Sequence, residues 1–196
     1  YIEECHRNFF ANYARGVPPR KCGSTEKHIG GLGGIVPVVA FYAGQPGKAL
    51  DMALTHLALT HPGPKMQTAA SLIITILLEV LNGKPLQEAI LVNHKAQNNP
   101  LLGHPFTKLL QEPDERGIGQ RFSPACYVED SVPAVIYLAL KYSDDPETAL
   151  EVNTNLGGDN VGRGAVLGAI LGAAHGPEGF PGRWVRGLLE PLPDLG

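Results

Sequence analysis

The feature that most constrains the fold of this chain is a glycine repeat near its end. Gly164, Gly168, Gly172 and Gly176 are spaced four residues apart, so in a helix all four lie along one face. Each interior glycine costs about 1 kcal/mol relative to alanine, a cost that is offset where another backbone packs very close. We therefore predict a tightly packed helix over residues 163–175.

The loop before this helix has features of a ligand-binding site. It reads Asn155-Leu-Gly-Gly-Asp-Asn160 and leads into a helix N-terminus, which offers free backbone N–H groups and the positive end of the helix dipole. Such a corner can hold an anion through its amides or a cation through Asp159. The alternative interpretation is that Asp159 only caps the helix.

Composition limits the class of protein. With 196 residues, 43% of them hydrophobic and 18% charged, the chain can bury a core and is not globally disordered. Gly 24 and Pro 17 make up about a fifth of the chain against an average of about 12%, which indicates many loops and close backbone contacts. A net charge of −3 without a basic stripe argues against a nucleic-acid partner.

The cysteines and apolar runs indicate location. Cys5, Cys22 and Cys126 form no CxxC pattern, which argues against a disulfide scaffold and favours a reducing compartment, so we expect a cytoplasmic protein. No H-x-x-H or H-x-x-x-H pair is present, so we expect no zinc site. No apolar run reaches the roughly 18 residues that span a bilayer, and we expect no membrane association.

Apolar residues recur at helical spacing along most of the chain. Besides the last helix, we predict helices over residues 1–15, 47–61, 66–81, 86–95, 133–142 and 145–153. For the helix that starts at Pro133, Asp130 or Ser131 is a plausible N-cap. Because no alternating strand pattern stands out, the fold is predicted to be mainly α.

The remaining segments are predicted as loops. Residues 22–34 are rich in glycine, and the apolar run 35–42 could be a strand by composition. Residues 97–124 read as a long surface loop with one helical turn near 106–111, and residues 177–196 as a loose Gly/Pro-rich tail. We predict one domain over residues 1–196.

Three blocks of the sequence, in order, resemble the signature of the ADP-ribosylglycohydrolase superfamily. Residues 153–176 are similar to its C-terminal pattern N-x-G-G-D-T-D-[ST], which is followed by glycines at every fourth position. Leu59-Thr-His-Pro62 resembles its L-T-H-P block, and Tyr127-Val-Glu-Asp-Ser-Val-Pro-Ala134 resembles its Y-V-x-D-[ST]-L-P-A block. The opening segment 1–22 is most similar to the branch of J-type lens crystallins and their selenoprotein relatives.

The resemblance implies an all-α, orthogonal multi-helix bundle that cleaves the glycosidic bond between ADP-ribose and an acceptor. It implies two magnesium ions, held between an N-terminal T-D-D-type motif and the C-terminal D-x-D-[ST] motif, because hard cations prefer oxygen ligands. The chain carries no T-D-D motif and opens like the middle of an amphipathic helix. We therefore expect the C-terminal portion of a larger domain, which associates with a missing N-terminal portion or forms a homo-oligomer.

The resemblance also implies site residues. The magnesium ligand is Asp159, and the residues expected to bind ADP-ribose or an ADP-ribosylated substrate are His61, Tyr127, Gly157, Gly158 and Arg163. Alternatives from the residues themselves stay open: His61 as a helix cap or surface residue, Tyr127 as a core tyrosine, Arg163 as a surface residue. No catalytic residue is identified.

Several positions depart from the family pattern. Val161 stands where the second Asp belongs and Gly162 where the Thr or Ser belongs, and the sequence His28-Ile-Gly-Gly-Leu-Gly-Gly34 replaces the family's G-N-G-A-A-M-R loop. Two hypotheses follow. The first is a magnesium-assisted ADP-ribosylglycohydrolase-like hydrolase, and the second is a non-catalytic, crystallin-like or nucleotide-sugar-binding relative with a degenerate metal site.

Overall fold

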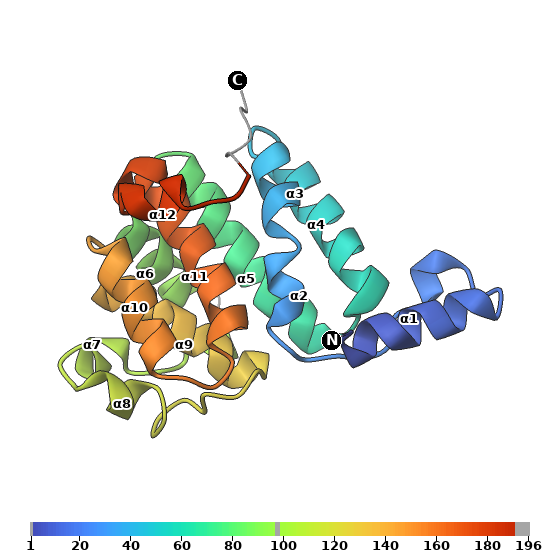
Figure 1. Cartoon of the computed structure of the whole chain (residues 1–196), viewed down its shortest axis with the longest axis horizontal. Helices are drawn as coiled ribbons and strands as arrows, with labels where there is room; N and C mark the ends of the chain where they lie inside the picture. The colour runs from blue at the N-terminus through green and yellow to red at the C-terminus, as the bar shows by residue number, and fades with distance from the viewer. Residues whose placement is uncertain (1, 97–98, 191–196) are drawn as a thin grey trace.

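The computed structural model describes residues 2–96 and 99–190, without the side chains of residues 94–96. Within these ranges no strand forms, and the predicted all-α fold is confirmed (Figure 1). Short 3₁₀ turns lie at Pro19–Lys21, Pro100–Leu102 and Pro177–Gly179. The α-helices are α1 (Glu4–Ala14), α2 (Gly30–Gly33), α3 (Val36–Phe41), α4 (Pro46–Thr60), α5 (Pro64–Leu81), α6 (Leu86–Ala96), α7 (Phe106–Leu109), α8 (Asp114–Gly117), α9 (Val128–Lys141), α10 (Pro146–Asn155), α11 (Asn160–His175) and α12 (Gly182–Arg186).

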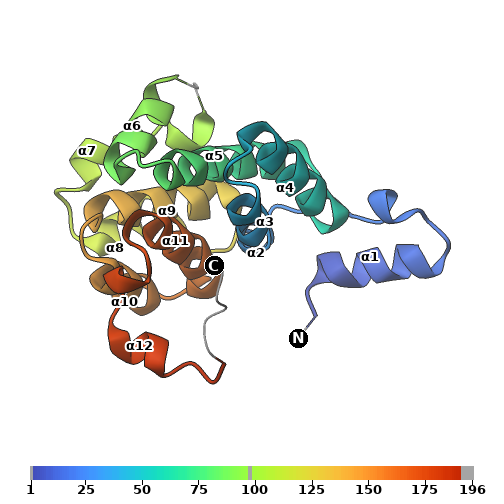
Figure 2. The same ribbon diagram turned by 90° about the horizontal axis from the view of Figure 1, so that it is seen from above.

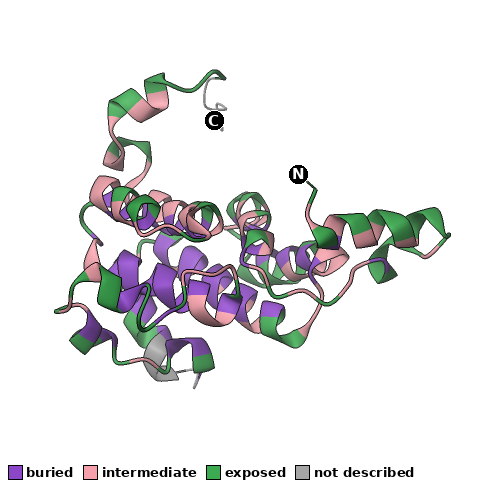
Figure 3. Ribbon diagram, turned by 60° about the horizontal axis from the view of Figure 1, so that its bottom comes forward, coloured by how far each residue is buried: buried purple, intermediate pink, exposed green. Residues whose placement is uncertain are grey.

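Helix α5 runs through the centre of the bundle. It packs against α4, α6, α9 and α11, and the buried residues of these helices form the core (Figure 3). Within the described residues, α5 is the one helix long and apolar enough to cross a membrane by length and composition, so the expectation that no segment reaches this length was too strict. More than half of α5 is buried inside the bundle, as for the core helix of a globular protein.

Local sequence signals mark the ends of several helices. Proline occupies the first turn of α4, α5 and α10, where its missing N–H costs nothing. Asn82 ends α5, and Gly83 follows with φ +88°. The Asp145 carboxylate accepts a hydrogen bond from the backbone N–H of Thr148 (3.0 Å) and caps α10.

Two segments form helices that the sequence did not predict. Residues 30–33, predicted as loop, form the single turn α2, and the apolar run 35–42, for which a strand was left open, forms helix α3. Ile29, Leu32 and Ile35 are fully buried, and α2 lies between α4 and α11. Burial of these apolar side chains therefore outweighs the low helix propensity of the glycines.

Helix α9 begins at Val128, five residues before the predicted start at Pro133. The Asp130 carboxylate accepts from a backbone N–H of the preceding segment (3.1 Å), and the Ser131 hydroxyl donates to a carbonyl of that segment (2.7 Å). These side chains therefore hold the preceding segment in place and do not cap the helix.

The segment after α6 contributes to the core. The helical turn predicted near 106–111 is confirmed as α7, but Leu101, Phe106, Leu109 and Phe122 are buried, so the surface-loop prediction was wrong for the described part of 97–124. Residues 97–98 lie outside the described residues. These apolar side chains belong to single helical turns and loops, which are too short to show the periodicity that reveals a longer helix.

The glycine face of α11 does not meet another backbone as predicted, because the atoms within 4 Å of a Cβ at Gly164, Gly168 or Gly172 belong to side chains, and Gly176 follows the helix as its C-cap. A Cβ at Gly164 would lie 3.1 Å from the Asn153 amide nitrogen of α10, and a Cβ at Gly168 would lie 3.9 Å from Leu150 of the same helix. The missing side chains therefore let α10 and α11 approach closely.

Helix α1 extends from the bundle like an arm, next to the C-terminal end of α4 (Figure 2). Cys5 is its one buried residue, whereas Phe10 and Tyr13 are exposed. At the other end of the chain, the predicted tail contains α12 and is described as far as residue 190. Residues 191–196 lie outside the described residues.

Candidate functional site

The glycine-rich loop and the Tyr127 block pair through their backbones. His28 and Tyr127 form an isolated antiparallel bridge, and the N–H of Ile29 donates to the carbonyl of Cys126 (2.8 Å). The two segments are far apart in the sequence, so this pairing fixes one side of a corner between α2 and the start of α9.

The loop before α11 is attached to the same corner. The backbone N–H of Asp159 donates to the carbonyl of Pro124 (2.9 Å). Gly158 has φ +64°, and a Cβ there would lie 2.1 Å from the Pro124 oxygen, so only glycine fits. Gly157 also has a positive φ, of 68°. The two predicted loop glycines therefore have a conformational role that brings the loop against residues 124–126.

Arg163 connects the loop before α11 to the segment around Pro124. It is fully buried, and its guanidinium donates to the carbonyl of Pro124 (2.9 Å), the carbonyl of Gly157 (2.6 Å) and the side-chain oxygen of Asn153 (3.1 Å). The surface alternative for Arg163 was therefore wrong. Its direct contact with a phosphate stays a prediction, and the observed contacts position the loop.

His61, the histidine of the Leu59–Pro62 block, is buried at the C-terminal end of α4. A Cβ at Gly31 would lie 2.7 Å from its ring, so α2 packs directly on the imidazole. Its Nδ1 lies 2.8 Å from the Thr60 hydroxyl and its Nε2 lies 3.5 Å from the Cys5 sulfur. Burial lowers the pKa of His61, although the carboxylates of Glu26 and Glu3 act in the opposite direction.

Tyr127 is accessible, with 40% of its surface exposed, so the alternative of a core tyrosine was wrong. Its ring stacks on the His28 imidazole (centroids 5.4 Å apart, 25° between planes), and the Lys27 ammonium lies 4.2 Å from the ring centroid. An aromatic face beside a cation suits a ligand that carries both an aromatic base and phosphates.

A cavity of about 400 Å³ opens beside these residues. Thr25, Glu26 and Lys27 line one side and residues 63–65 the other. The Glu26 carboxylate lies 3.0 Å from His28 Nδ1. Neither His61 nor Tyr127 lines this cavity, but both contact the adjoining segment 28–31, because Tyr127 stacks on His28 and His61 lies against Gly31.

The residues around Asp159 do not complete a magnesium site. Oδ1 of Asp159 accepts from the backbone N–H of Gly162 (3.1 Å), so Asp159 caps α11. Val161 is 79% exposed and has no ligand atom. A Cβ at Gly162 would lie 2.6 Å from Ile29 Cγ2 and 2.7 Å from Asp159 Oδ2, so a Thr or Ser side chain does not fit there. The described residues therefore offer one carboxylate where a pair of hard cations needs several.

Sequence reasoning missed the residues that face His61. Within the described part of the chain, the one group of three His, Cys, Asp or Glu side chains that could hold a metal is Glu3, Cys5 and His61. It joins α1 to the end of α4, so no local spacing in the sequence reveals it. The adjacent Cys5 and His6 are the one local indication of a metal site here, and a pattern based on histidine pairs alone does not include them.

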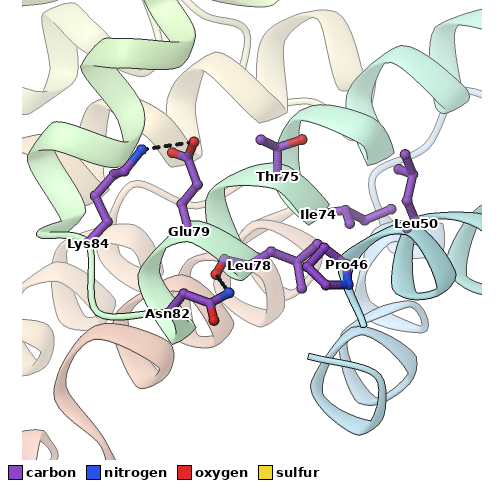
Figure 4. Close-up of a pocket in the computed structure, with 9 residues that line it drawn as sticks. Pro46, Leu50, Ile74, Thr75, Leu78, Glu79, Asn82 and Lys84 are labelled. Carbon is purple, nitrogen blue, oxygen red and sulfur yellow. Dashed lines mark hydrogen bonds and ion pairs between the residues drawn. The ribbon is translucent and has the colours of Figure 1, made fainter. Parts of the chain in front are cut away.

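A second cavity, of about 470 Å³, lies at the opposite end of α5, between this helix and the start of α4 (Figure 4). Leu50, Ile74 and Leu78 give it apolar walls, and the ion pair of Glu79 with Lys84 (3.0 Å) lies at one edge. No residue of the family-like blocks lines this cavity.

The ADP-ribosylglycohydrolase family matches residues 2–195. The chain belongs to the ADP-ribosylglycohydrolase family. A solved structure titled "ADP-ribosylglycohydrolase-related protein complex" is 27% identical, with a TM-score of 0.72 over 95% of this chain and 63% of that chain. The chain thus spans less than two thirds of that structure's length. No curated protein matches the chain.

Proposed function

We propose that this chain recognises an ADP-ribosyl group at the corner made by residues 25–29, 61–65, 123–128 and 157–159, and that it takes part in hydrolysing a glycosidic bond to ADP-ribose. The observation that carries this proposal is the convergence of the three family blocks on the loop around His28. Ligand sites in helical proteins form preferentially between helices, where a few polar groups converge.

Each side of the corner suits a part of the ligand. The exposed Tyr127 ring offers a stacking face for the adenine, and Lys27 beside it attracts the diphosphate. The Gly158 amide, before the N-terminus of the 16-residue helix α11, suits a phosphate, whereas the Gly157 amide donates to the carbonyl of Thr154 (3.2 Å). His61 lies behind α2 and closes the base of the corner.

Asp159 is the one residue of this chain that we propose as a magnesium ligand. We propose that Asp159 supplies one oxygen ligand and that the other acidic ligands come from a part of the protein outside these residues or from a second copy of the chain. We also propose a cytoplasmic location, because all three cysteines are unpaired. Nucleic acid and membrane are not proposed as partners.

A second candidate function is binding without cleavage, as in a crystallin-like or nucleotide-sugar-binding relative. It is favoured by Val161 and by the contact of Gly162 with Ile29, which together remove two of the three positions of the C-terminal metal motif. ADP-ribose binding is common to both candidates, and turnover separates them.

The test is a calorimetric titration of ADP-ribose with and without magnesium, followed by an assay for ADP-ribose release from an ADP-ribosylated arginine or serine peptide. The matched variant is Asp159→Asn, because asparagine keeps the helix cap but loses the charge. Magnesium-dependent binding that Asp159→Asn weakens supports the hydrolase. Magnesium-independent binding without turnover supports the second candidate. No binding by the folded chain would contradict both.

A further inference from the structure

We propose that Glu3, Cys5 and His61 form a binding site for a zinc-like divalent cation, which ties the α1 arm to the end of α4. This site differs from the magnesium site of the proposed function in its residues and in the kind of ion. It rests on the mutual positions of three ligand atoms that lie within 4.8 Å of one another.

The distances fit tetrahedral coordination. Bonds of about 2.3 Å from zinc to sulfur and about 2.0 Å to nitrogen or oxygen place a sulfur about 3.5 Å from each other ligand atom at a tetrahedral angle. The Cys5 sulfur lies 3.5 Å from His61 Nε2 and 3.7 Å from Glu3 Oε2. Both distances from the sulfur therefore match the spacing around a central ion, and the Glu3 and His61 ligand atoms lie within 4.8 Å of each other.

The charges also favour a divalent ion. A carboxylate, a thiolate and a neutral imidazole carry a total charge of −2, which one divalent cation neutralises, so the site can be buried at low cost. Cys5 and His61 are both buried.

The mixture of donor atoms selects among cations. Sulfur, nitrogen and one carboxylate oxygen suit zinc and cobalt, whereas magnesium and calcium prefer oxygen ligands alone. His6 Nδ1 lies 3.5 Å from the same sulfur and 3.7 Å from Glu3 Oε2, although His6 is not one of the three residues of the group.

The surroundings orient the histidine ligand. The Thr60 hydroxyl lies 2.8 Å from Nδ1 of His61. In the tautomer in which Nδ1–H donates to this hydroxyl, the lone pair of Nε2 is free for a metal ion, as in most metal-bound histidines. Gly31 lets α2 pack on the ring and fix its plane. The imidazole is therefore held in a ligand orientation by residues that do not themselves bind the ion.

The test is a titration of the purified, reduced chain with Zn²⁺ and with Co²⁺. We expect one equivalent to bind, and the Co²⁺ form to show a sulfur-to-cobalt charge-transfer band in the near ultraviolet. Glu3→Gln and Cys5→Ser should each weaken binding more than about 100-fold, because even residues that only orient ligands contribute about 10–100-fold. Matched controls are Cys22→Ser, whose sulfur contacts the backbone carbonyls of Val17 and Pro18 instead, and the exposed His56→Ala.

Hydrogen exchange provides a second readout. Zinc should slow amide exchange in residues 4–14, because the ion joins α1 to the bundle, and Mg²⁺ should not. Binding that survives Cys5→Ser, that is lost in Cys22→Ser, or that does not occur in the folded wild-type chain would overturn the proposal. None of these outcomes depends on ADP-ribose, so the site is tested apart from the proposed function.

Discussion

Gly31 lies against the imidazole of His61 so closely that a Cβ on this glycine would be 2.7 Å from the ring. The contact sets the distance between α2 and the end of α4, and with it the position of the loop that carries His28. A methyl group at residue 31 has to displace either the ring or α2.

Gly31→Ala should therefore lower the free energy of unfolding by about 1–3 kcal/mol, as overpacking of a tight contact does. Gly47→Ala is the matched control, because no atom lies within 4 Å of a Cβ at this helical glycine, and it should be neutral or stabilising by up to about 1 kcal/mol. Urea denaturation measures both. Equal effects of the two substitutions would show that the contact with His61 is not tight in solution.

The Arg163 guanidinium should be required for the loop before α11. Arg163→Lys keeps the charge but cannot reach all three acceptors, so we expect a loss of about 2–3 kcal/mol, since buried carbonyls are left without donors. Arg183→Lys is the control: Arg183 forms an exposed ion pair with Glu147, and its replacement should change stability by less than about 1 kcal/mol. A neutral Arg163→Lys in chemical denaturation would contradict the positioning role.

Val161 and Gly162 should respond differently to the family's metal-binding residues. Val161→Asp places a carboxylate on an exposed position and should change stability by less than about 0.5 kcal/mol. Gly162→Thr brings a side chain against Ile29 and should be destabilising by about 1–3 kcal/mol. Thermal unfolding compares the two variants. A stable Gly162→Thr chain would mean that α2 and α11 separate easily.

The alkaline stability of the chain should depend on Tyr142. Burial and then its hydrogen bond to Asp114 (2.7 Å) raise the pKa of Tyr142 to about 12. The unfolded chain therefore releases this proton near pH 10 while the folded chain keeps it, and stability falls as the pH rises from about 10 to 12. Tyr142→Phe should cost about 1 kcal/mol at neutral pH and show a shallower alkaline loss. Parallel pH profiles of the two proteins above pH 10 would contradict this.

The stability of the chain at acid pH should depend on Asp114. Burial alone would raise its pKa, but the hydrogen bonds from Lys141, Tyr142 and Tyr137 outweigh burial, and the pKa is lowered. Its contribution to stability is therefore present above the unfolded pKa and is lost as the pH falls through the lower folded pKa. Asp114→Asn should flatten the loss of stability measured by denaturant titrations between pH 5 and pH 2. An unchanged acid profile would exclude this role.

The parts of the fold that could be predicted from sequence are those with local signals. Periodicity and end signals located α4, α5, α6, α10 and α11, whereas the glycine spacing of α11 predicted a close approach of another backbone that is not found. Helices α2 and α3 could not be predicted, because they are short and are held by burial of side chains such as Ile29 and Val39 against distant helices. The start of α9 was missed because Pro133, a strong start signal, lies inside the helix.

The candidate site was predictable only in its motif residues. Family resemblance pointed to His61, Tyr127 and Asp159, but their burial and partners are properties of the packed structure. Arg163 is buried although it lies in the first turn of α11, next to a polar loop. Cys5 faces His61 across 56 residues of sequence, and no spacing rule connects them.

The most direct test of the central claim maps where ADP-ribose contacts the chain. Amide hydrogen exchange with and without saturating ADP-ribose should show protection in residues 25–29, 61–65 and 123–128, and the protection should weaken in Tyr127→Ala more than in Tyr127→Phe, which keeps the stacking ring. Protection confined to residues 46–50 and 74–84, around the cavity of Figure 4, or protection that is the same in both variants, would contradict the account.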